Sequence, residues 1–453
     1  MDSIRRWNQV ALDAAGVDHT PAASGENRAF YEQLGPGRSS RAMAIVHIAM
    51  FDTVNALVRE YQSYTGVQAP SAPHSMQAAI SQAAHDTLVA LYPAQTASFD
   101  ARLAEDLDQI LNHIAKANGI ALGKRAATAI LSLRTGDGSQ YPDPPMGAPG
   151  WVTSDLPGHW RQDPISLFPL AIGPYWGECK PFVMDAPTQF RAPPPPPMNS
   201  PEYAAAFNET KRLGGDGIVT PTERNLEQTH IGIYWAYDAT PSLCAPPRLY
   251  NQITVHLADQ MGTEGIQLAR LLALVNVAMA DAAIAIWESK YHYDFWRPIT
   301  GIRESDPGTS PTGVGDDNDA TVGDLIWTPL GAPASNLAGP NFTPPFPSYP
   351  SGHAGFGGAL FQTLRRFYGR DDIAFTFVSD EFNGITQDSS GNVRPLLPRS
   401  FSSLSQAEEE NGQSRIYLGI HWRFDKTESI ALGRRVGNYV FDNVFLPLRP
   451  PAQ

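Results

Sequence analysis

Apolar residues recur every three or four positions along much of this chain, the spacing that places them on one face of an α-helix. Residues 41–60 show the pattern clearly, with apolar side chains at Ile45, Ile48, Ala49, Val54 and Leu57. The same spacing predicts four further helices before residue 136, at residues 7–15, 76–92, 97–117 and 119–134. We expect breaks at Pro93, Asn118 and Gly136. Residues 1–135 are therefore interpreted as an antiparallel helical bundle.

Residues 136–199 are rich in proline, glycine and tryptophan and contain the proline run 193–197. Trp151, Trp160 and Trp176 make this stretch too aromatic for a flexible linker. We expect an irregular connection that packs across the surface and helps to shape the mouth of a pocket.

Helical signals return in residues 200–453. Ser200-Pro201 opens one helix, and Thr220-Pro-Thr-Glu223 is typical of a capping box before a helix that includes residues 235–238. Thr263 starts another helix, which continues through Trp287 to Lys290. Long segments that alternate apolar and polar residues are missing from the sequence, so we predict an all-α protein with a second helical bundle at residues 200–453.

Composition narrows the class of protein. The 453 residues carry a formal net charge of −13, which makes nucleic acid and anionic membrane surfaces improbable partners. We find no apolar run of membrane-spanning length and no signal-peptide core after Arg5-Arg6. The sequence predicts a soluble protein, cytoplasmic or exported with its leader absent, and leaves its oligomeric state open, a homo-oligomer included.

Several residues outside the main motifs have ordinary explanations. Cys179 and Cys244 are interpreted as inert thiols. His47 and His85 are interpreted as core or surface histidines. The acidic run 316–319 lacks the glycine and the final glutamate of an EF-hand, so a solvated turn is preferred to a calcium site.

Candidate chemistry begins at Pro347-Ser-Tyr-Pro-Ser-Gly-His353. Pro350 sets a turn, Ser351 can cap the following helix, and Gly352 allows close approach of the backbone. The N–H groups at such a helix start, with a hydroxyl and an imidazole, suit a tetrahedral oxyanion. The plain alternative is a capped helix that contains a buried histidine.

Two other segments add positive charge. Lys290 and Arg297 lie seven residues apart, on one face if the helix continues until Pro298 ends it. Near the C-terminus, Arg415 closes a helix, Gly419 can act as a C-cap, His421 lies in the connection, and Asp425 caps the next helix. Together the three segments carry more cationic groups than a protein core would bury without an anion.

The residues themselves leave the reaction open. The two arginines suit fork-like pairing with oxyanion oxygens, and the lysine supplies a point charge. One histidine can attack or coordinate the central atom while the other shuttles protons. With phosphate, this arrangement gives a soluble acid phosphatase that forms a phosphohistidine. A non-catalytic oxyanion-binding protein is a third hypothesis.

These segments resemble the signature Lys-x6-Arg-Pro, Pro-Ser-x-x-Ser-Gly-His and Ser-Arg-x5-His-x3-Asp of the vanadium-dependent haloperoxidases. Type 2 phosphatidic acid phosphatases and bacterial acid phosphatases share it. The chain is most similar to the fungal chloroperoxidase and bacterial type, strongly over residues 220–440 and faintly at 7–12. The resemblance extends to four auxiliary segments, residues 235–238, 246–252, 296–303 and 331–336.

The resemblance implies two four-helix-bundle-like halves, with an active site in the C-terminal bundle that binds vanadate or, alternatively, phosphate. It implies His421 as the one protein ligand to vanadium and His353 as the partner of the apical hydroxide. Lys290 is implied to polarise peroxide, so that halide is oxidised to a hypohalous acid equivalent that halogenates a small organic acceptor. The residues implied to hold the vanadate oxygens are Lys290, Arg297, Ser351, Gly352 and Arg415.

Three more positions follow from the resemblance. Asp238 matches an aspartate that pairs with Arg415, although a surface acid at a helix end is the alternative. Trp287 and Phe346 match the halide pocket of the fungal enzymes, with a core tryptophan as the alternative for Trp287. Residues 291–293, Tyr-His-Tyr, depart from the expected residues and leave the polarity of the pocket open. We expect bromide and iodide to be oxidised readily and leave chloride open.

Overall fold

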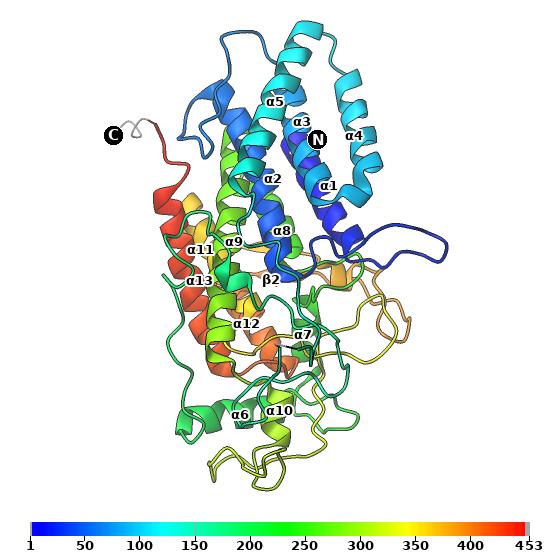
Figure 1. The fold of residues 1–453 in the computed structure, drawn as a ribbon, viewed down its shortest axis with the longest axis vertical. Helices are drawn as coiled ribbons and strands as arrows, with labels where there is room; N and C mark the ends of the chain where they lie inside the picture. The colour runs from blue at the N-terminus through cyan, green and yellow to red at the C-terminus, as the bar shows by residue number, and fades with distance from the viewer. Residues whose placement is uncertain (1, 150, 449–453) are drawn as a thin grey trace.

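The computed structural model describes residues 2–149 and 151–448, and helices dominate this part of the chain (Figure 1). One short antiparallel sheet is present within it, in which β1 (Phe375–Phe377) pairs with β2 (Arg399–Phe401). The predicted all-α fold class is therefore confirmed.

Five helices form the N-terminal part: α1 (Ser3–Asp18), α2 (Gly35–Val58), α3 (Met76–Leu91), α4 (Thr96–Asp108) and α5 (His113–Leu133). The predicted break at Asn118 is wrong. The helices separate at residues 109–112, because the Asn112 side chain accepts a hydrogen bond from the Ala115 N–H and starts α5 there. Asn118 lies inside α5 and donates its side-chain N–H to the Pro73 carbonyl.

The connection after α5 is irregular, as predicted, apart from the short 3₁₀ helix η2 (Trp176–Glu178). A similar turn, η1 (Pro93–Gln95), precedes α4. Trp160 and Trp176 are buried, so the connection packs against the rest of the protein at these positions, whereas Val152, Leu156 and Leu167 are exposed. Phe168 and Ile172 from this segment line the large cavity described below.

The C-terminal part contains α6 (Pro201–Leu213), α7 (Leu226–Tyr234), α8 (Pro246–Gln260), α9 (Gly265–Tyr293), α10 (Pro298–Arg303), α11 (Gly352–Tyr368), η3 (Asp380–Phe382), α12 (Leu404–Tyr417) and α13 (Arg423–Asn443). The capping box predicted at residues 220–223 is wrong, because Asn225 and Gln228 form it instead. The helix it starts ends at Tyr234, before residues 235–238. Helix α8 was not predicted from the sequence, since its start at Pro246 has no side-chain cap.

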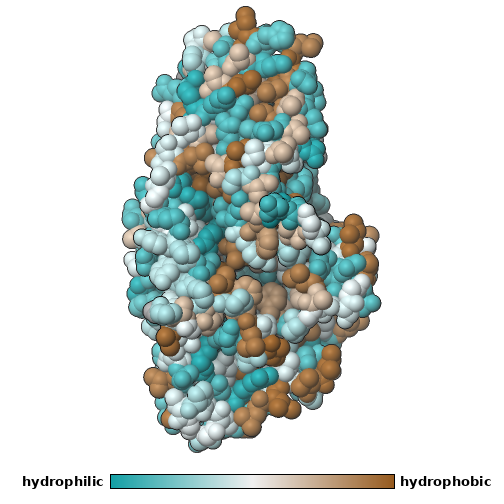
Figure 2. Space-filling view, turned by 45° about the vertical axis from the view of Figure 1, so that its right-hand side comes forward, coloured by the Kyte–Doolittle hydropathy of each residue, from teal (hydrophilic) through white to brown (hydrophobic). Residues whose placement is uncertain are grey.

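Helix α9 is the central element and packs against α2, α11 and α13 (Figure 1). Contrary to the sequence analysis, α2 and α9 are long and apolar enough to cross a membrane. The most apolar part of α9 is 100% buried, however, and that of α2 is 83% buried, as in the core helices of soluble proteins. On the face shown in Figure 2, hydrophilic and hydrophobic residues are interspersed. One buried cluster joins the two parts of the chain.

Glycines allow α11 and α13 to pack closely. A Cβ at Gly433 would lie 2.1 Å from the Gly355 carbonyl oxygen, and a Cβ at Gly358 would lie 2.6 Å from the Ile430 carbonyl oxygen. Larger residues would push the two helices apart. This packing brings the N-terminal ends of α11 and α13 together.

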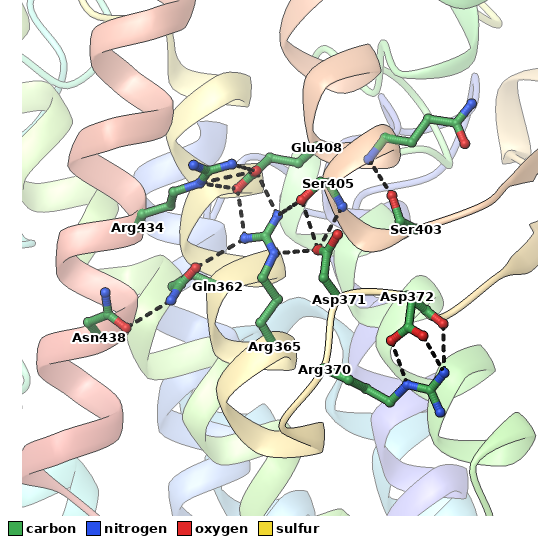
Figure 3. Close-up of polar contacts among 11 residues, drawn as sticks. Gln362, Arg365, Arg370, Asp371, Asp372, Ser403, Ser405, Glu408, Arg434 and Asn438 are labelled. Carbon is green, nitrogen blue, oxygen red and sulfur yellow. Dashed lines mark hydrogen bonds and ion pairs between the residues drawn. The ribbon is translucent and has the colours of Figure 1, made fainter.

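A polar network holds the same helices together farther along α11. Glu408 of α12 is 1% exposed and accepts hydrogen bonds from Arg365 of α11 and Arg434 of α13 (Figure 3). Asp371, which follows α11, also accepts from Arg365, at 2.6 Å. The network therefore links α11, α12 and α13 away from the N-terminus of α11.

Candidate active site

The predicted site residues meet around the N-terminus of α11. They come from the end of α9, the loop after it, the N-cap and first turn of α11, the last turn of α12, and the connection between α12 and α13. All seven are buried: Lys290, Arg297, Ser351, Gly352, His353, Arg415 and His421.

Lys290 lies near the end of α9 and points at the turn before α11. Its Nζ donates hydrogen bonds to the carbonyls of Pro347 and Ser348, at 2.8 and 2.9 Å. The ammonium group also lies 5.1 Å from the ring centroid of Phe346. Burial lowers the pKa of Lys290 well below its usual range, and the neighbouring Arg297 charge lowers it further.

Arg297 reaches the site by a different route from the one predicted. Helix α9 ends at Tyr293, because Asp294 has a left-handed backbone with φ of 49°. Pro298 opens α10 and does not end α9, with Arg297 as the N-cap residue. The predicted continuous helix is therefore wrong. Arg297 still donates to the Phe346 carbonyl at 2.9 Å and to the Ile420 carbonyl at 2.8 Å.

His421 is held between a carboxylate and a guanidinium. Its Nδ1 lies 2.7 Å from Oδ2 of Asp425, and its Nε2 lies 3.1 Å from Nη1 of Arg297. A carboxylate accepts and a guanidinium donates, so Nδ1 carries the proton and Nε2 carries the lone pair. Burial lowers the pKa of His421 well below its usual range, and Arg297 lowers it further.

Asp425 is a site residue that the sequence analysis read only as a helix cap. It caps α13 as predicted, from the third position of the helix, with Trp422 as the N-cap residue. The Asp425 carboxylate accepts from the Trp422 N–H at 3.0 Å and from the Ser348 hydroxyl. Burial raises the pKa of Asp425 to about 6. Its spacing of four residues from His421 within a helix start was the available signal.

Ser351 and His353 begin α11. Ser351 is the N-cap residue, as predicted, and its Oγ accepts from the Ala354 N–H at 3.5 Å. Nε2 of His353 donates to the Ala236 carbonyl, and the Tyr250 hydroxyl donates to the His353 carbonyl at 3.0 Å. Burial lowers the pKa of His353 well below its usual range, with Arg415 as the next cause.

Arg415 forms a two-point ion pair with Asp238, as predicted. Its Nη2 lies 2.6 Å from Oδ1 of Asp238, and its Nη1 lies 3.2 Å from Oδ2. Asp238 is only 8% exposed, so the alternative of a surface acid is wrong. Burial raises the pKa of Asp238, although Arg415 opposes the change.

A cavity of about 260 Å³ opens above this cluster. His353, His421, Asp238 and Arg415 line its inner end. Trp287 and Phe346 contribute aromatic wall, with ring centroids 5.0 Å apart. The remaining wall is mostly apolar and includes Leu34, Phe168, Ile172, Leu337, Phe342, Pro344 and Phe356.

Residues 291–293 left the polarity of the pocket open in the sequence, and the structure gives a hydrogen-bond partner to each of the two tyrosines. The Tyr291 hydroxyl donates to the Ile172 carbonyl at 2.8 Å, and the Tyr293 hydroxyl donates to the Ala192 carbonyl at 2.7 Å. The intervening His292 is exposed and lies beside Arg191. The cavity-lining side chains nearest Lys290 in this region are the aromatic rings of Trp287 and Phe346.

Other predictions outside the site have simple outcomes. Cys179 and Cys244 are free and buried within the described residues, as expected. His47 is a core histidine with 1% exposure. In the acidic run 316–319, Asp317 and Asp319 are exposed as predicted, whereas Asp316 is 2% exposed and accepts from the Thr321 hydroxyl.

Comparison with known proteins identifies the family. Residues 270–448 match the family model described as the VCPO second helical-bundle domain. The chain is 30% identical to the vanadium chloroperoxidase of Curvularia inaequalis, over 92% of this chain and 78% of that protein.

Solved structures agree on the fold. The first bacterial vanadium-dependent iodoperoxidase superposes with a TM-score of 0.74 at 23% identity, covering 98% of both chains. The holo form of a bacterial vanadium-dependent chloroperoxidase superposes with a TM-score of 0.64 at 17% identity, covering 90% of this chain and 92% of that one.

These relationships favour halide oxidation over the acid phosphatase alternative. They also account for the three signature segments, which the fold brings into one buried cluster. The chain belongs to the vanadium-dependent haloperoxidases, enzymes that oxidise halides with peroxide and use vanadate as cofactor.

Proposed function

We propose that vanadate binds in the buried cluster at the N-terminus of α11, with Nε2 of His421 as its one protein ligand. Lys290, Arg297 and Arg415 would neutralise its charge, while the Ser351 hydroxyl and the Gly352 N–H would bond its oxygens. The first N–H groups of a helix have no partner inside the helix and are available to an anion.

One observation supports this proposal most strongly. In the described part of the cluster, only two carboxylates face the three cations Lys290, Arg297 and Arg415: Asp238 forms an ion pair with Arg415, and the charge of Asp425 acts on the other two without a direct contact. Among residues 2–149 and 151–448, Nη2 of Arg297 and Nε of Arg415 are buried without a hydrogen-bond partner. Buried charged donors without partners are costly, so the site fits an oxyanion.

The tautomer of His421 supports the same assignment. Asp425 holds the Nδ1 proton, so the Nε2 lone pair faces the arginine side of the site. Imidazole ligands to metals are commonly oriented by a carboxylate on the other ring nitrogen. The depressed pKa keeps the ring neutral, which ligation requires.

His353 and Lys290 would perform the proton and charge chemistry. When bound, vanadium(V) supplies a Lewis acid that activates peroxide without changing its oxidation state. His353 is neutral in its buried position, with its Nε2 proton on the Ala236 carbonyl, so Nδ1 is available to accept a proton. A bound oxyanion would oppose the effect of burial on the Lys290 pKa and favour the ammonium form. Lys290 would then place its charge beside the reacting oxygen, in surroundings where burial strengthens its field.

The cavity above the cluster would receive the halide and the organic acceptor. Trp287 and Phe346 form a wall with little competing hydrogen bonding, which suits a weakly hydrated anion such as bromide or iodide. The apolar outer wall suits a small organic molecule, since a cavity of roughly 150 Å³ already holds a benzene ring. This pocket is larger, at about 260 Å³.

We also propose that phosphate occupies the vanadate position, because both anions present four oxygens to the same donors. The test is to add orthovanadate to vanadate-free protein with peroxide and bromide, and then to titrate phosphate. Bromide oxidation should appear with vanadate and fall competitively with phosphate. Phosphate that leaves the apparent vanadate affinity unchanged would show that the two anions do not share a site.

A further inference from the structure

The peptide group between Ala236 and Tyr237 is hydrogen-bonded on both sides. Its carbonyl accepts from Nε2 of His353. Its N–H, on Tyr237, donates to Oε1 of Glu381 at 3.2 Å. One amide therefore connects the candidate proton-transfer histidine to a buried glutamate in a different part of the chain.

Glu381 is itself firmly held. It belongs to η3 and is 0% exposed. Its Oε2 accepts from the Ser335 hydroxyl at 2.7 Å and from the Arg394 guanidinium. Arg394 also donates to the Ser335 hydroxyl, at 2.9 Å. The two carboxylate oxygens thus have separate donors: Oε2 accepts from Arg394 and Ser335, and Oε1 accepts from the Tyr237 N–H.

The backbone that Glu381 contacts needs such support. Tyr237 has φ of 44° and Ala239 has φ of 59°, in the left-handed region that residues other than glycine avoid. The neighbouring Asp380 N–H donates to the Tyr237 hydroxyl at 2.7 Å. Residues 380 and 381 therefore hold Tyr237 at both its backbone and its side chain, directly before Asp238.

We propose that Glu381 is a positioning residue for halide oxidation, acting on His353 through the Ala236–Tyr237 peptide. By fixing the N–H of this peptide, the carboxylate directs its carbonyl at His353 and polarises it. The carbonyl in turn holds the proton on Nε2, so that Nδ1 keeps its lone pair. This inference rests on the proposed role of His353 in proton transfer.

The test compares Glu381→Gln with a matched control. A glutamine has one side-chain oxygen and cannot accept from Tyr237 and from Arg394 on separate oxygens. The control is Glu408→Gln, which alters another buried glutamate held by two arginines, in the network of Figure 3. Ser335→Ala is a milder second variant, because it removes one donor to Glu381 and leaves the carboxylate in place.

The first readout is histidine-selective ¹⁵N NMR of vanadate-free protein, with the His353 signals assigned by their loss in His353→Gln. Wild type and Glu408→Gln should show His353 protonated on Nε2. Glu381→Gln should show a mixture of tautomers or a shifted Nε2 signal, with a smaller change in Ser335→Ala.

The second readout is steady-state bromide oxidation. Glu381→Gln should lower kcat by roughly tenfold to a hundredfold, the range expected when a catalytic group loses its alignment. Vanadate affinity and the KM for peroxide should change little, and Glu408→Gln should keep the wild-type kcat.

An unchanged His353 signal in folded Glu381→Gln, or an equal loss of kcat in Glu381→Gln and Glu408→Gln, would overturn the inference. If Glu381→Gln does not fold, an unchanged His353 signal in Ser335→Ala would overturn the inference instead. His353→Ala separates the two proposals. Full turnover in that variant would reject the role of His353 itself, whereas lost turnover in His353→Ala with wild-type turnover in Glu381→Gln rejects only the role of Glu381.

Discussion

Nη1 of Arg297 lies 3.1 Å from Nε2 of His421, the atom to which we assign the vanadium. This guanidinium donates to the lone pair that we propose as the vanadium ligand. Vanadate bound at this nitrogen would replace that hydrogen bond, while the Nδ1 contact to Asp425 at 2.7 Å would be kept. Arg297 therefore contacts the proposed ligating nitrogen and is, after burial, the main cause of the lowered His421 pKa.

The first prediction concerns the titration of His421. Arg297 is the strongest neighbouring charge that lowers the His421 pKa, after burial. Arg297→Gln should therefore raise the pKa of His421 toward its ordinary value of about 6.5. A histidine whose pKa is lower in the folded state than in the unfolded state destabilises the fold as the pH falls below the unfolded-state pKa. The loss of stability at acidic pH should therefore be smaller in Arg297→Gln than in wild type.

NMR titration of histidine-labelled, vanadate-free protein measures this pKa, and thermal unfolding between about pH 5 and 8 measures the stability. Arg365→Gln is a control for the loss of an arginine elsewhere, since Arg365 contacts Glu408 rather than His421 (Figure 3). The same His421 pKa in wild type and Arg297→Gln would show that the contact does not set the charge of the ring.

The second prediction concerns the packing of α11 against α13. A Cβ at Gly433 would lie 2.1 Å from the Gly355 carbonyl oxygen, whereas a Cβ at Gly437 would lie 3.0 Å from the Ala359 carbonyl oxygen. Gly433→Ala should therefore destabilise the protein by about 1–3 kcal/mol and weaken vanadate binding. Gly437→Ala is the matched control and should have a smaller effect. Denaturant unfolding measures both, and equal effects of the two variants would contradict the close-packing argument.

Features that depend on contacts between neighbouring residues could be predicted from the sequence, whereas those that depend on contacts between distant residues could not. The cap at Ser351 follows from neighbouring residues and was predicted correctly. The break between α4 and α5 was misplaced, because both Asn112 and Asn118 can interrupt a helix and the sequence did not show that the Asn112 side chain caps α5. Local signals also could not show that α9 stops at Tyr293, where Asp294 takes a left-handed conformation.

The site residues divide in the same way. The residues of the three signature segments were identified through the family resemblance, which rests on their order and spacing. The contact between Tyr237 and Glu381 joins residues 144 positions apart and leaves no local pattern. Asp425 was visible in the sequence, but its carboxylate could be assigned to His421 only after the start of α13 was located.

The third prediction concerns halide preference. The Phe346 ring lies 5.1 Å from Nζ of Lys290 and 5.0 Å from the Arg297 guanidinium, so it forms part of the cavity wall beside two of the proposed oxyanion-binding cations. Phe346→His places a polar ring there and should admit water. Chloride is harder to oxidise than bromide, so any chloride activity should fall more than bromide activity, while Phe346→Leu should largely preserve the ratio.

The ratio of kcat/KM for chloride to that for bromide, at one pH and fixed peroxide, measures this effect. A ratio that is the same in wild type and Phe346→His would show that Phe346 does not form part of the halide site.

The central claim is that the buried cluster is the vanadate site, with His421 as ligand and His353 in proton transfer. Equilibrium dialysis of vanadate against wild type, His421→Ala and His353→Ala tests it most directly. We predict that His421→Ala abolishes tight binding, because no other side chain in the cluster is assigned to the central atom. His353→Ala should retain vanadate but lose about 10²–10⁴-fold in turnover. Tight vanadate binding by His421→Ala together with loss of binding in His353→Ala would contradict the assignment.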